Sequence, residues 1–264
     1  MVEPILTVEG LKTHFNLREG MLKAVDGISF SLAPDEVLCI VGESGSGKTT
    51  VARCIARLTD PSSGEIFLDG KEIGRLRTGQ LRPYRRRIQI IFQDPYRSLN
   101  PRRVVGDSII EGATNYGLPK EEALKRARSL MELVQLDPNA LDRFPHQFSG
   151  GQRQRICIAR ALTMEPEVLI ADEAVSALDV SVQAQVLKLL DDVRKRFNLT
   201  LLFITHDLRV AAQICDTVAV MSQSKVVEYG LTRDVFTNPQ HEYTQSLLNA
   251  APGKGWDFGA FLAP

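Results

Sequence analysis

Eight consecutive residues combine glycines with a lysine and a threonine in a spacing suited to binding phosphate. Residues 42–49 fit the pattern G-x-x-x-x-G-K-[ST], between an apolar run at 37–41 and a helix-like segment at 50–56. Glycine permits backbone conformations in which successive N–H groups face phosphate oxygens at the positive end of a helix. We predict a phosphate-binding loop, the P-loop, made of Gly42, Glu43, Ser44, Gly45, Ser46, Gly47, Lys48, Thr49 and Thr50.

Two side chains of this loop have predicted roles in binding phosphate and magnesium, and two carboxylates later in the sequence are expected to act at the same site. Lys48 is expected to reach the terminal phosphates of a nucleotide, and the Thr49 hydroxyl to hold magnesium. Asp172 and Glu173 follow an apolar run at 168–171, and the carboxyl end of a parallel strand is where ligands bind. Asp172 is expected to hold magnesium through its waters, and Glu173 to orient or deprotonate an attacking water. Taken alone, the pair could equally be a solvated acidic turn.

A third cluster of small polar residues follows Phe148. Ser149 occupies an N-cap position, and the helix after it is predicted to run to about Met164. A serine and two glycines at a helix start form another anion-binding surface. By itself the cluster would be an ordinary capped loop, but here it is a second candidate surface for phosphate. Its residues are Ser149, Gly150, Gly151 and Gln152.

The segments that must position these residues alternate between strand and helix patterns. Short strand patterns occur at 6–11, 28–32, 65–70, 88–92, 168–171 and 201–204. Residues 104–136 instead show helical spacing without a strand pattern, and 182–197 form another predicted helix. Alternation of strands and helices implies a parallel sheet. We therefore predict an α/β fold with a helical subdomain inserted at about residues 94–165.

Composition narrows the class of protein. The chain has 264 residues, 44% hydrophobic, with 32 Lys plus Arg balanced by 32 Asp plus Glu. Such a balance gives no overall attraction to nucleic acid or to an anionic membrane. We expect no signal peptide and no membrane span, so that a membrane role would come through a partner. The cysteines form no C-x-x-C pair and are expected to be buried, reduced thiols of a cytosolic protein: Cys39, Cys54, Cys157 and Cys215.

A basic stretch at 75–87 contains six arginines. A nucleic-acid-binding surface would also show interleaved aromatic residues and a basic domain. Only Tyr84 lies within the stretch. We therefore expect a solvated or phosphate-adjacent surface here, and no nucleic-acid partner.

The three polar clusters, in this order, resemble those of the ATP-binding cassette (ABC) ATPases. The resemblance covers about residues 6–252, and it implies a P-loop NTPase cassette with a RecA-like core, an N-terminal antiparallel β subdomain and an inserted α-helical signature subdomain. We expect a single domain at 1–250 and a short flexible tail at 251–264. Matching the family's motifs to this sequence identifies a magnesium-sensing glutamine, a D-loop aspartate, a switch histidine that contacts the terminal phosphate, and an aromatic residue that stacks on adenine: Gln93, Asp179, His206 and Phe15.

The resemblance implies ATP as nucleotide and Mg²⁺ as its ion, which Thr49, Gln93 and Asp172 would hold. It implies catalytic roles for Lys48, Gln93, Glu173 and His206. Two cassettes would face head to tail, so that the turn at 149–152 caps nucleotide on the partner. Many members of the family have Pro-Thr after the catalytic glutamate, where this chain has Ala174-Val175. Because Glu173 is present, the site is predicted to be competent.

Three segments look like the oligopeptide, dipeptide and nickel importer subfamily, at 93–102, 180–186 and 238–248. That likeness implies a second ATPase subunit, identical or paralogous, two transmembrane permeases and a periplasmic or extracellular substrate-binding protein. The chain would then lie peripherally on the cytoplasmic face of the inner or cell membrane. Peptides or related small solutes are the implied cargo. A soluble ABC ATPase accessory to a phosphonate-lyase-type complex is the alternative, and a non-catalytic nucleotide-binding module is disfavoured by Glu173 and His206.

Overall fold

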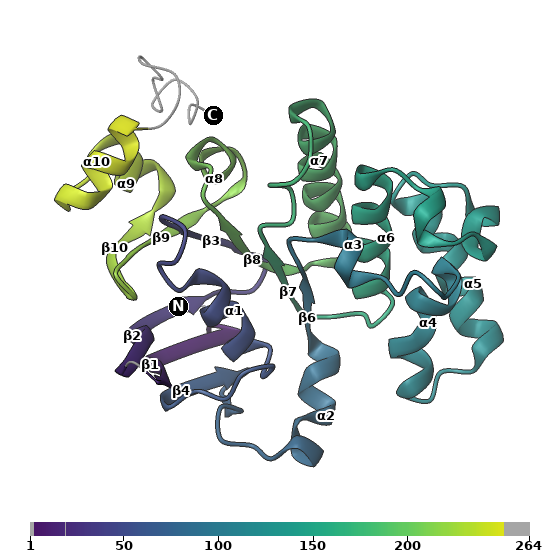
Figure 1. Ribbon diagram of the computed structural model, residues 1–264, viewed down its shortest axis with the longest axis horizontal. Coiled ribbons are helices and arrows are strands. Elements are labelled where there is room, and N and C mark those ends of the chain that lie inside the picture. The colour runs from purple at the N-terminus through teal and green to yellow at the C-terminus, as the bar shows by residue number, and fades with distance from the viewer. Residues whose placement is uncertain (1–2, 19, 251–264) are drawn as a thin grey trace.

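A six-stranded sheet forms the centre of the molecule and a four-stranded sheet packs beside it (Figure 1). This computed structural model describes residues 3–18 and 20–250, so the tail predicted to be flexible at 251–264 lies outside the described residues. In spatial order the central sheet consists of β10 (Lys225–Leu231), β9 (Thr217–Ser222), β3 (Val37–Val41), β8 (Thr200–Thr205), β7 (Val168–Asp172) and β6 (Ile88–Ile91). All neighbours pair in parallel except β10, which pairs antiparallel with β9. The predicted parallel core is confirmed.

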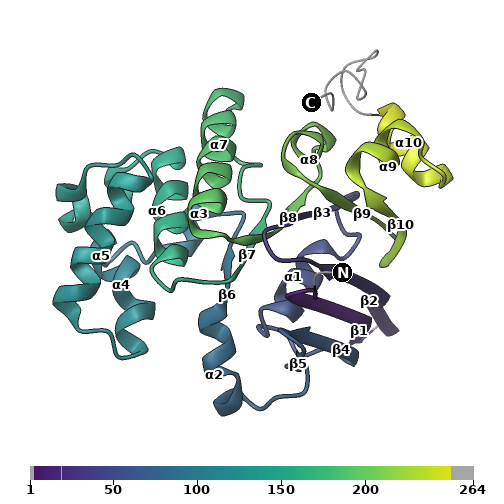
Figure 2. The same cartoon turned by 180° about the vertical axis from the view of Figure 1, so that it is seen from behind.

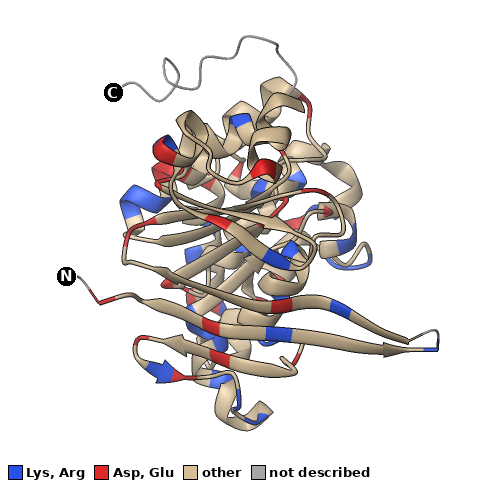
Figure 3. Cartoon of the chain, turned by 90° about the vertical axis from the view of Figure 1, so that its left-hand side faces the viewer, with Lys and Arg blue, Asp and Glu red and all other residues tan. Residues whose placement is uncertain are grey.

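The second sheet is antiparallel and comes mainly from the N-terminal part of the chain. Its order is β2 (Gly20–Leu32), β1 (Leu6–Leu17), β4 (Ser63–Leu68) and β5 (Lys71–Glu72). Strands β1 and β2 are longer than the patterns at 6–11 and 28–32 predicted, and their paired ends form an arm that projects from the molecule (Figure 3). Most residues of this arm are exposed on both faces, so alternation of apolar and polar residues does not mark it.

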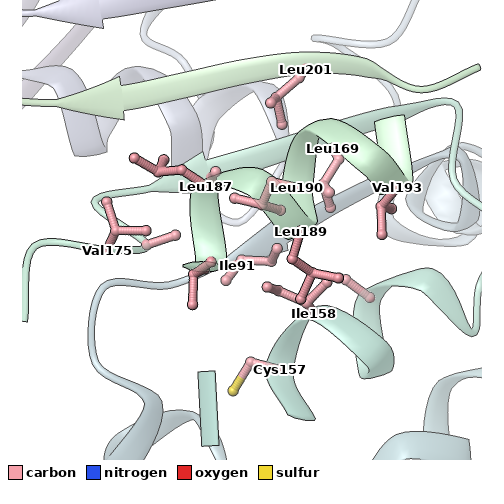
Figure 4. Packing of buried hydrophobic residues seen from close by; sticks show 14 of the residues in the cluster. Ile91, Cys157, Ile158, Leu169, Val175, Leu187, Leu189, Leu190, Val193 and Leu201 are labelled. Carbon is pink, nitrogen blue, oxygen red and sulfur yellow. The ribbon is translucent and has the colours of Figure 1, made fainter. Parts of the chain in front are cut away.

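Both faces of the central sheet are buried, because successive side chains of a strand point to opposite faces. In β3, Leu38 and Ile40 pack into the cluster shared with the antiparallel sheet. Val37, Cys39 and Val41 face the larger cluster, which is covered by helices. Figure 4 shows part of that cluster, where leucines of α7 (Val180–Phe197) pack against β7 and β8. All four cysteines are buried with free thiols, as predicted.

The helices between β6 and β7 gather on one side of the central sheet (Figures 1 and 2). The predicted helical stretch at 104–136 is two helices, because Gly117 adopts φ +95° and Pro119 follows it. The helices of this part are α3 (Pro95–Ser98), α4 (Val105–Asn115), α5 (Lys120–Leu133) and α6 (Gly150–Leu162), with short 3₁₀ turns η1 (Pro138–Asp142) and η2 (Pro145–Gln147). The remaining helices are α1 (Lys48–Ile55), α2 (Thr78–Arg87), α8 (Leu208–Ile214), α9 (Thr232–Thr237) and α10 (Glu242–Ala250). Among the helices at 3–18 and 20–250, none combines the length and the apolar character that crossing a membrane requires.

Candidate functional site

The P-loop joins β3 to α1 and is pressed between two other strands. Gly42 and Gly47 adopt φ +148° and +103°, a region that side chains rarely enter. A Cβ on Gly47 would lie 2.1 Å from the carbonyl oxygen of Ala24, and one on Gly42 would lie 2.1 Å from that of Met221. Glycine is therefore required at both ends of the loop by conformation and by space. The result is a backbone cradle in front of the N-terminus of α1, as a bound phosphate needs.

Lys48 lies buried at the base of this cradle. Its Nζ donates hydrogen bonds of 2.8 Å to the carbonyl oxygens of both Gly42 and Glu43. Burial lowers the pKa of Lys48, while the nearby carboxylates of Glu173 and Asp172 act to raise it. The ammonium group is thus held by two carbonyl oxygens, and phosphate oxygens could take their place.

Thr49 and Asp172 meet across the end of the central sheet. The Thr49 Oγ1 donates to Asp172 Oδ1 at 3.0 Å. Asp172 is 3% exposed, and burial raises its pKa although the bond from Thr49 opposes this shift. In the described part of the chain, no three or more His, Cys, Asp or Glu side chains gather into a metal cage. Magnesium needs no such cage, since it binds through one or two protein oxygens, waters and substrate phosphates, so this hydroxyl and carboxylate fit it.

Glu173 comes directly after β7 in a left-handed conformation, with φ +49°. Its N–H donates to the carbonyl oxygen of Ile204 at 2.9 Å, which holds this uncommon backbone shape. Its carboxylate Oε2 accepts a 2.8 Å hydrogen bond from Gln93 Nε2 and lies 3.6 Å from His206 Nδ1. Three side chains with predicted catalytic roles therefore meet at one oxygen, although they come from three different segments.

Lys48, Thr49, Gln93 and Glu173 line an open groove of about 380 Å³, whereas Asp172 and His206 are not among its lining residues. Asp172 lines a neighbouring pocket together with Thr49 and Gln93. Phe15 is one of the lining residues, 39% exposed and directly opposite Leu22 in the β1–β2 pairing. An apolar wall next to a phosphate cradle suits a base joined to a polyphosphate. The lining residues are Phe15, Leu22, Lys23, Ala24, Ser44, Gly45, Gly47, Lys48, Thr49, Thr50, Gln93, Glu173 and Ser224.

Four of these lining residues were not predicted from the sequence: Leu22, Lys23, Ala24 and Ser224. The strand pairing brings Leu22 next to Phe15, and a hydrogen bond from Ser224 Oγ to the Lys23 carbonyl oxygen joins the β9–β10 turn to β2 at 2.6 Å. Leu22 could have been identified from the sequence if the pairing register of the long hairpin had been predicted. Nothing in the local sequence around Ser224 indicates its position.

The turn at 149–152 lies elsewhere. Strands β6 and β7 lie between α1, which follows the P-loop, and α6, which follows the turn (Figures 1 and 2). None of the residues 149–152 lines the groove. Ser149 Oγ accepts from the Gln152 N–H at 3.3 Å, and Gln152 Oε1 accepts from the Ser149 N–H at 2.9 Å. This reciprocal capping box starts α6 as predicted. Ser149 and Gln152 are exposed, and so is Asp179, which precedes α7.

The arginines at the end of α2 have partners of their own. Arg87 pairs with Glu167 through bonds of 2.5 and 2.6 Å, and Arg86 lies 3.3 Å from Glu165. Neither arginine lines the groove at the P-loop. Ion pairs with neighbouring acids account for the positions of these two side chains.

The chain is similar in sequence and in fold to known ATP-binding proteins. Residues 25–176 match the family described as ABC transporter. The chain is 50% identical over 250 residues to a Brucella ovis protein named "Putative peptide import ATP-binding protein", with 94% of this chain and 79% of that protein covered. It is 52% identical to the glutathione import ATP-binding protein GsiA of Escherichia coli, covering 95% of this chain but 41% of that longer protein. A dimeric structure of the ATP-binding cassette MJ0796 with ADP and Pi superposes with a TM-score of 0.79 at 26% identity, over 86% of this chain and 98% of that one.

Proposed function

Because this chain belongs to the ABC transporter family of ATPases, we propose that it energises an importer of peptides or related small solutes by binding and hydrolysing ATP. The observation that carries this proposal is the gathering of Lys48, Thr49, Gln93 and Glu173 along one groove, with Asp172 hydrogen-bonded to Thr49 beside it. We propose that residues up to 250 act as one cassette domain, with the helices at about 94–165 as its insert.

The proposed roles follow from the geometry of the groove. Lys48 would exchange its two carbonyl partners for the terminal phosphates, and the backbone of the P-loop would hold the phosphate chain. Thr49, Gln93 and Asp172 would hold Mg²⁺, which supplies charge stabilisation when bound. Glu173, held by Gln93 and beside His206, would accept the proton of the attacking water. Phe15 would stack on the adenine.

The position of the exposed turn at 149–152 supports pairing with a second cassette. A capped helix start suits a phosphate, and yet this one lies outside the chain's own groove. We propose that Ser149, Gly150, Gly151 and Gln152 contact nucleotide held by the partner, with Asp179 near the same contact. The partner is a copy of this chain or a paralogue, and the dimeric MJ0796 structure is consistent with either.

The proposal extends to the surrounding assembly. The relatives' names describe import proteins, which supports two transmembrane permeases as partners, a periplasmic or extracellular substrate-binding protein, and a peripheral position on the cytoplasmic face of the membrane. It includes no nucleic-acid partner. The alternative of an accessory to a phosphonate-lyase-type complex is not favoured, because these relatives at 50–52% identity are named for import.

Reconstituted transport tests the function. The chain, its cognate permeases and its partner cassette would be placed in vesicles, and ATP-dependent uptake of labelled peptides measured. Glu173→Gln should lower ATP turnover and uptake by about a hundredfold to ten-thousandfold, as loss of a general base does, while leaving ATP bound. Glu132→Gln, on the exposed side of α5, is the matched control and should change neither. Wild-type vesicles that take up no peptide, or full turnover in Glu173→Gln, would contradict the proposal.

A further inference from the structure

The last described helix, α10, contacts the P-loop directly. The backbone N–H of Glu43 donates a hydrogen bond to Tyr243 Oη at 3.1 Å, between residues 200 positions apart in the sequence. Tyr243 belongs to the segment at 238–248 that resembles the importer subfamily, but none of the roles assigned above at the nucleotide site falls on it. A side chain that reaches the phosphate cradle from the far end of the chain could control the shape of that cradle.

Packing of the ring and hydrogen bonds at the start of α10 position Tyr243. The ring is half-buried and packs against the larger hydrophobic cluster together with Leu247 and Leu248, the residues four and five positions later on α10. The Tyr243 N–H donates to His241 Nδ1 at 3.1 Å, and the His241 N–H donates to Glu228 Oε2 of β10 at 3.1 Å. The start of α10 is therefore tied to the central sheet, and Tyr243 can act as a fixed acceptor.

The group that Tyr243 holds is the peptide unit between Gly42 and Glu43. This unit is planar, and in its trans form the N–H and the carbonyl point in opposite directions. The N–H meets Tyr243 Oη, and the carbonyl oxygen on the other side accepts the 2.8 Å bond from Lys48 Nζ. The orientation of this one peptide therefore links the hydroxyl of Tyr243 to the ammonium group of Lys48.

We propose that Tyr243 is a positioning residue for nucleotide binding, whose hydroxyl holds the Gly42–Glu43 peptide so that the first half of the P-loop is ready to receive phosphates. This inference rests on the proposed function, in which the groove binds ATP. Without the hydroxyl, the Glu43 N–H loses this partner while Lys48 still holds the carbonyl side, so the peptide is less firmly oriented and nucleotide binding must order the loop at a cost in affinity. Loss of one neutral hydrogen bond of this kind should weaken nucleotide affinity roughly three- to tenfold.

Replacing Tyr243 with Phe isolates the hydroxyl, because the ring and its packing remain. The matched control is Tyr229→Phe in β10, which removes a hydroxyl that donates to the Ser31 carbonyl oxygen at 3.1 Å, away from the groove. The full-length variants would be titrated with ATP and with ADP, and their melting temperatures and ATPase kinetics measured. We expect the Kd of Tyr243→Phe to rise by a similar factor for both nucleotides, with kcat at saturating ATP within about twofold of wild type. Without nucleotide, Tyr243→Phe should melt no lower than Tyr229→Phe.

A purely structural role for Tyr243 would lower the melting temperature and leave both Kd values unchanged, which would overturn the inference. So would an equal loss of affinity in the two variants, or a lower kcat at unchanged KM. If the wild-type chain binds neither nucleotide, the proposed function fails and the inference fails with it. Normal binding by the wild type together with unchanged binding by Tyr243→Phe would overturn the inference alone.

Discussion

At the scale of single residues, the buried carboxyl group of Asp172 is expected to lower the stability of the folded protein. Burial raises the pKa of this carboxyl above its ordinary value of 3.8, so the folded chain holds a proton there more tightly than the unfolded chain. Such a group favours folding most at low pH, and this contribution is lost as the pH rises through the raised pKa. At neutral pH the buried carboxylate should therefore destabilise the nucleotide-free protein relative to a neutral amide.

We predict that Asp172→Asn raises the melting temperature at neutral pH by ~2–4 °C, the shift expected for about 1 kcal/mol in a chain of this size. The amide oxygen can still accept the bond from Thr49. The gain should shrink as the pH is lowered toward 3.8, because the wild-type carboxyl then becomes neutral as well. Melting curves across this pH range measure the effect, with Asp142→Asn at the exposed end of η1 as the control. A gain independent of pH would show that the charge is not the cause.

At the scale of elements, the contact between α6 and α7 depends on a missing side chain. A Cβ on Gly151 would lie 2.5 Å from Val182 Cγ1, so the Val182 side chain or one of the two helices would have to shift. Gly150 differs from its neighbour, since a Cβ there would have no neighbouring atom closer than 4.0 Å. The glycine at 151 is thus explained by helix packing, in addition to any contact with phosphate.

We expect Gly151→Ala to lower the free energy of unfolding by roughly 1–3 kcal/mol through overcrowding. Gly150→Ala should cost much less. Because Val182→Ala removes the crowded methyl group, the cost of Gly151→Ala should largely disappear in the double variant. Urea unfolding of the single and double variants gives the interaction free energy. Strictly additive effects would mean that the two helices do not meet at this point.

At the scale of the whole molecule, the separation between the groove and the turn at 149–152 predicts association driven by ATP. Aspartate and asparagine both cap a helix as well as serine does, so Ser149→Asp and Ser149→Asn should both preserve α6. Only aspartate would place a negative charge against the triphosphate on the partner, which should weaken association roughly a hundredfold or more.

Sedimentation with ATP and magnesium would measure this association in the Glu173→Gln background, for the chain alone and mixed with its cognate paralogue. Ser149→Asn is the neutral control and should associate nearly as well as the Ser149 protein. Equal association of the two variants, with α6 intact by circular dichroism, would remove the turn from the interface between cassettes.

The sequence alone determined the features that lie within short segments. Residues 42–49, the carboxylates after 168–171 and the capped turn at 149–152 each combine a local strand or helix signal with the polar groups at its end. These are relations between neighbours in the chain, and backbone conformation and capping act at that range. The parallel order of the core followed from the alternation of such segments.

Only the tertiary structure decided which of these segments share a groove. Leu22 lies opposite Phe15 because of the pairing register of a hairpin arm with two exposed faces. Ser224 and Tyr243 contact Lys23 and Glu43, from which they are separated by about 200 residues in the sequence. Register and docking depend on pairings between distant residues, so they leave no periodic signal in either segment. The placement of Ser149 outside the groove is equally a result of packing, since it follows from where α6 lies against α7 and the central sheet.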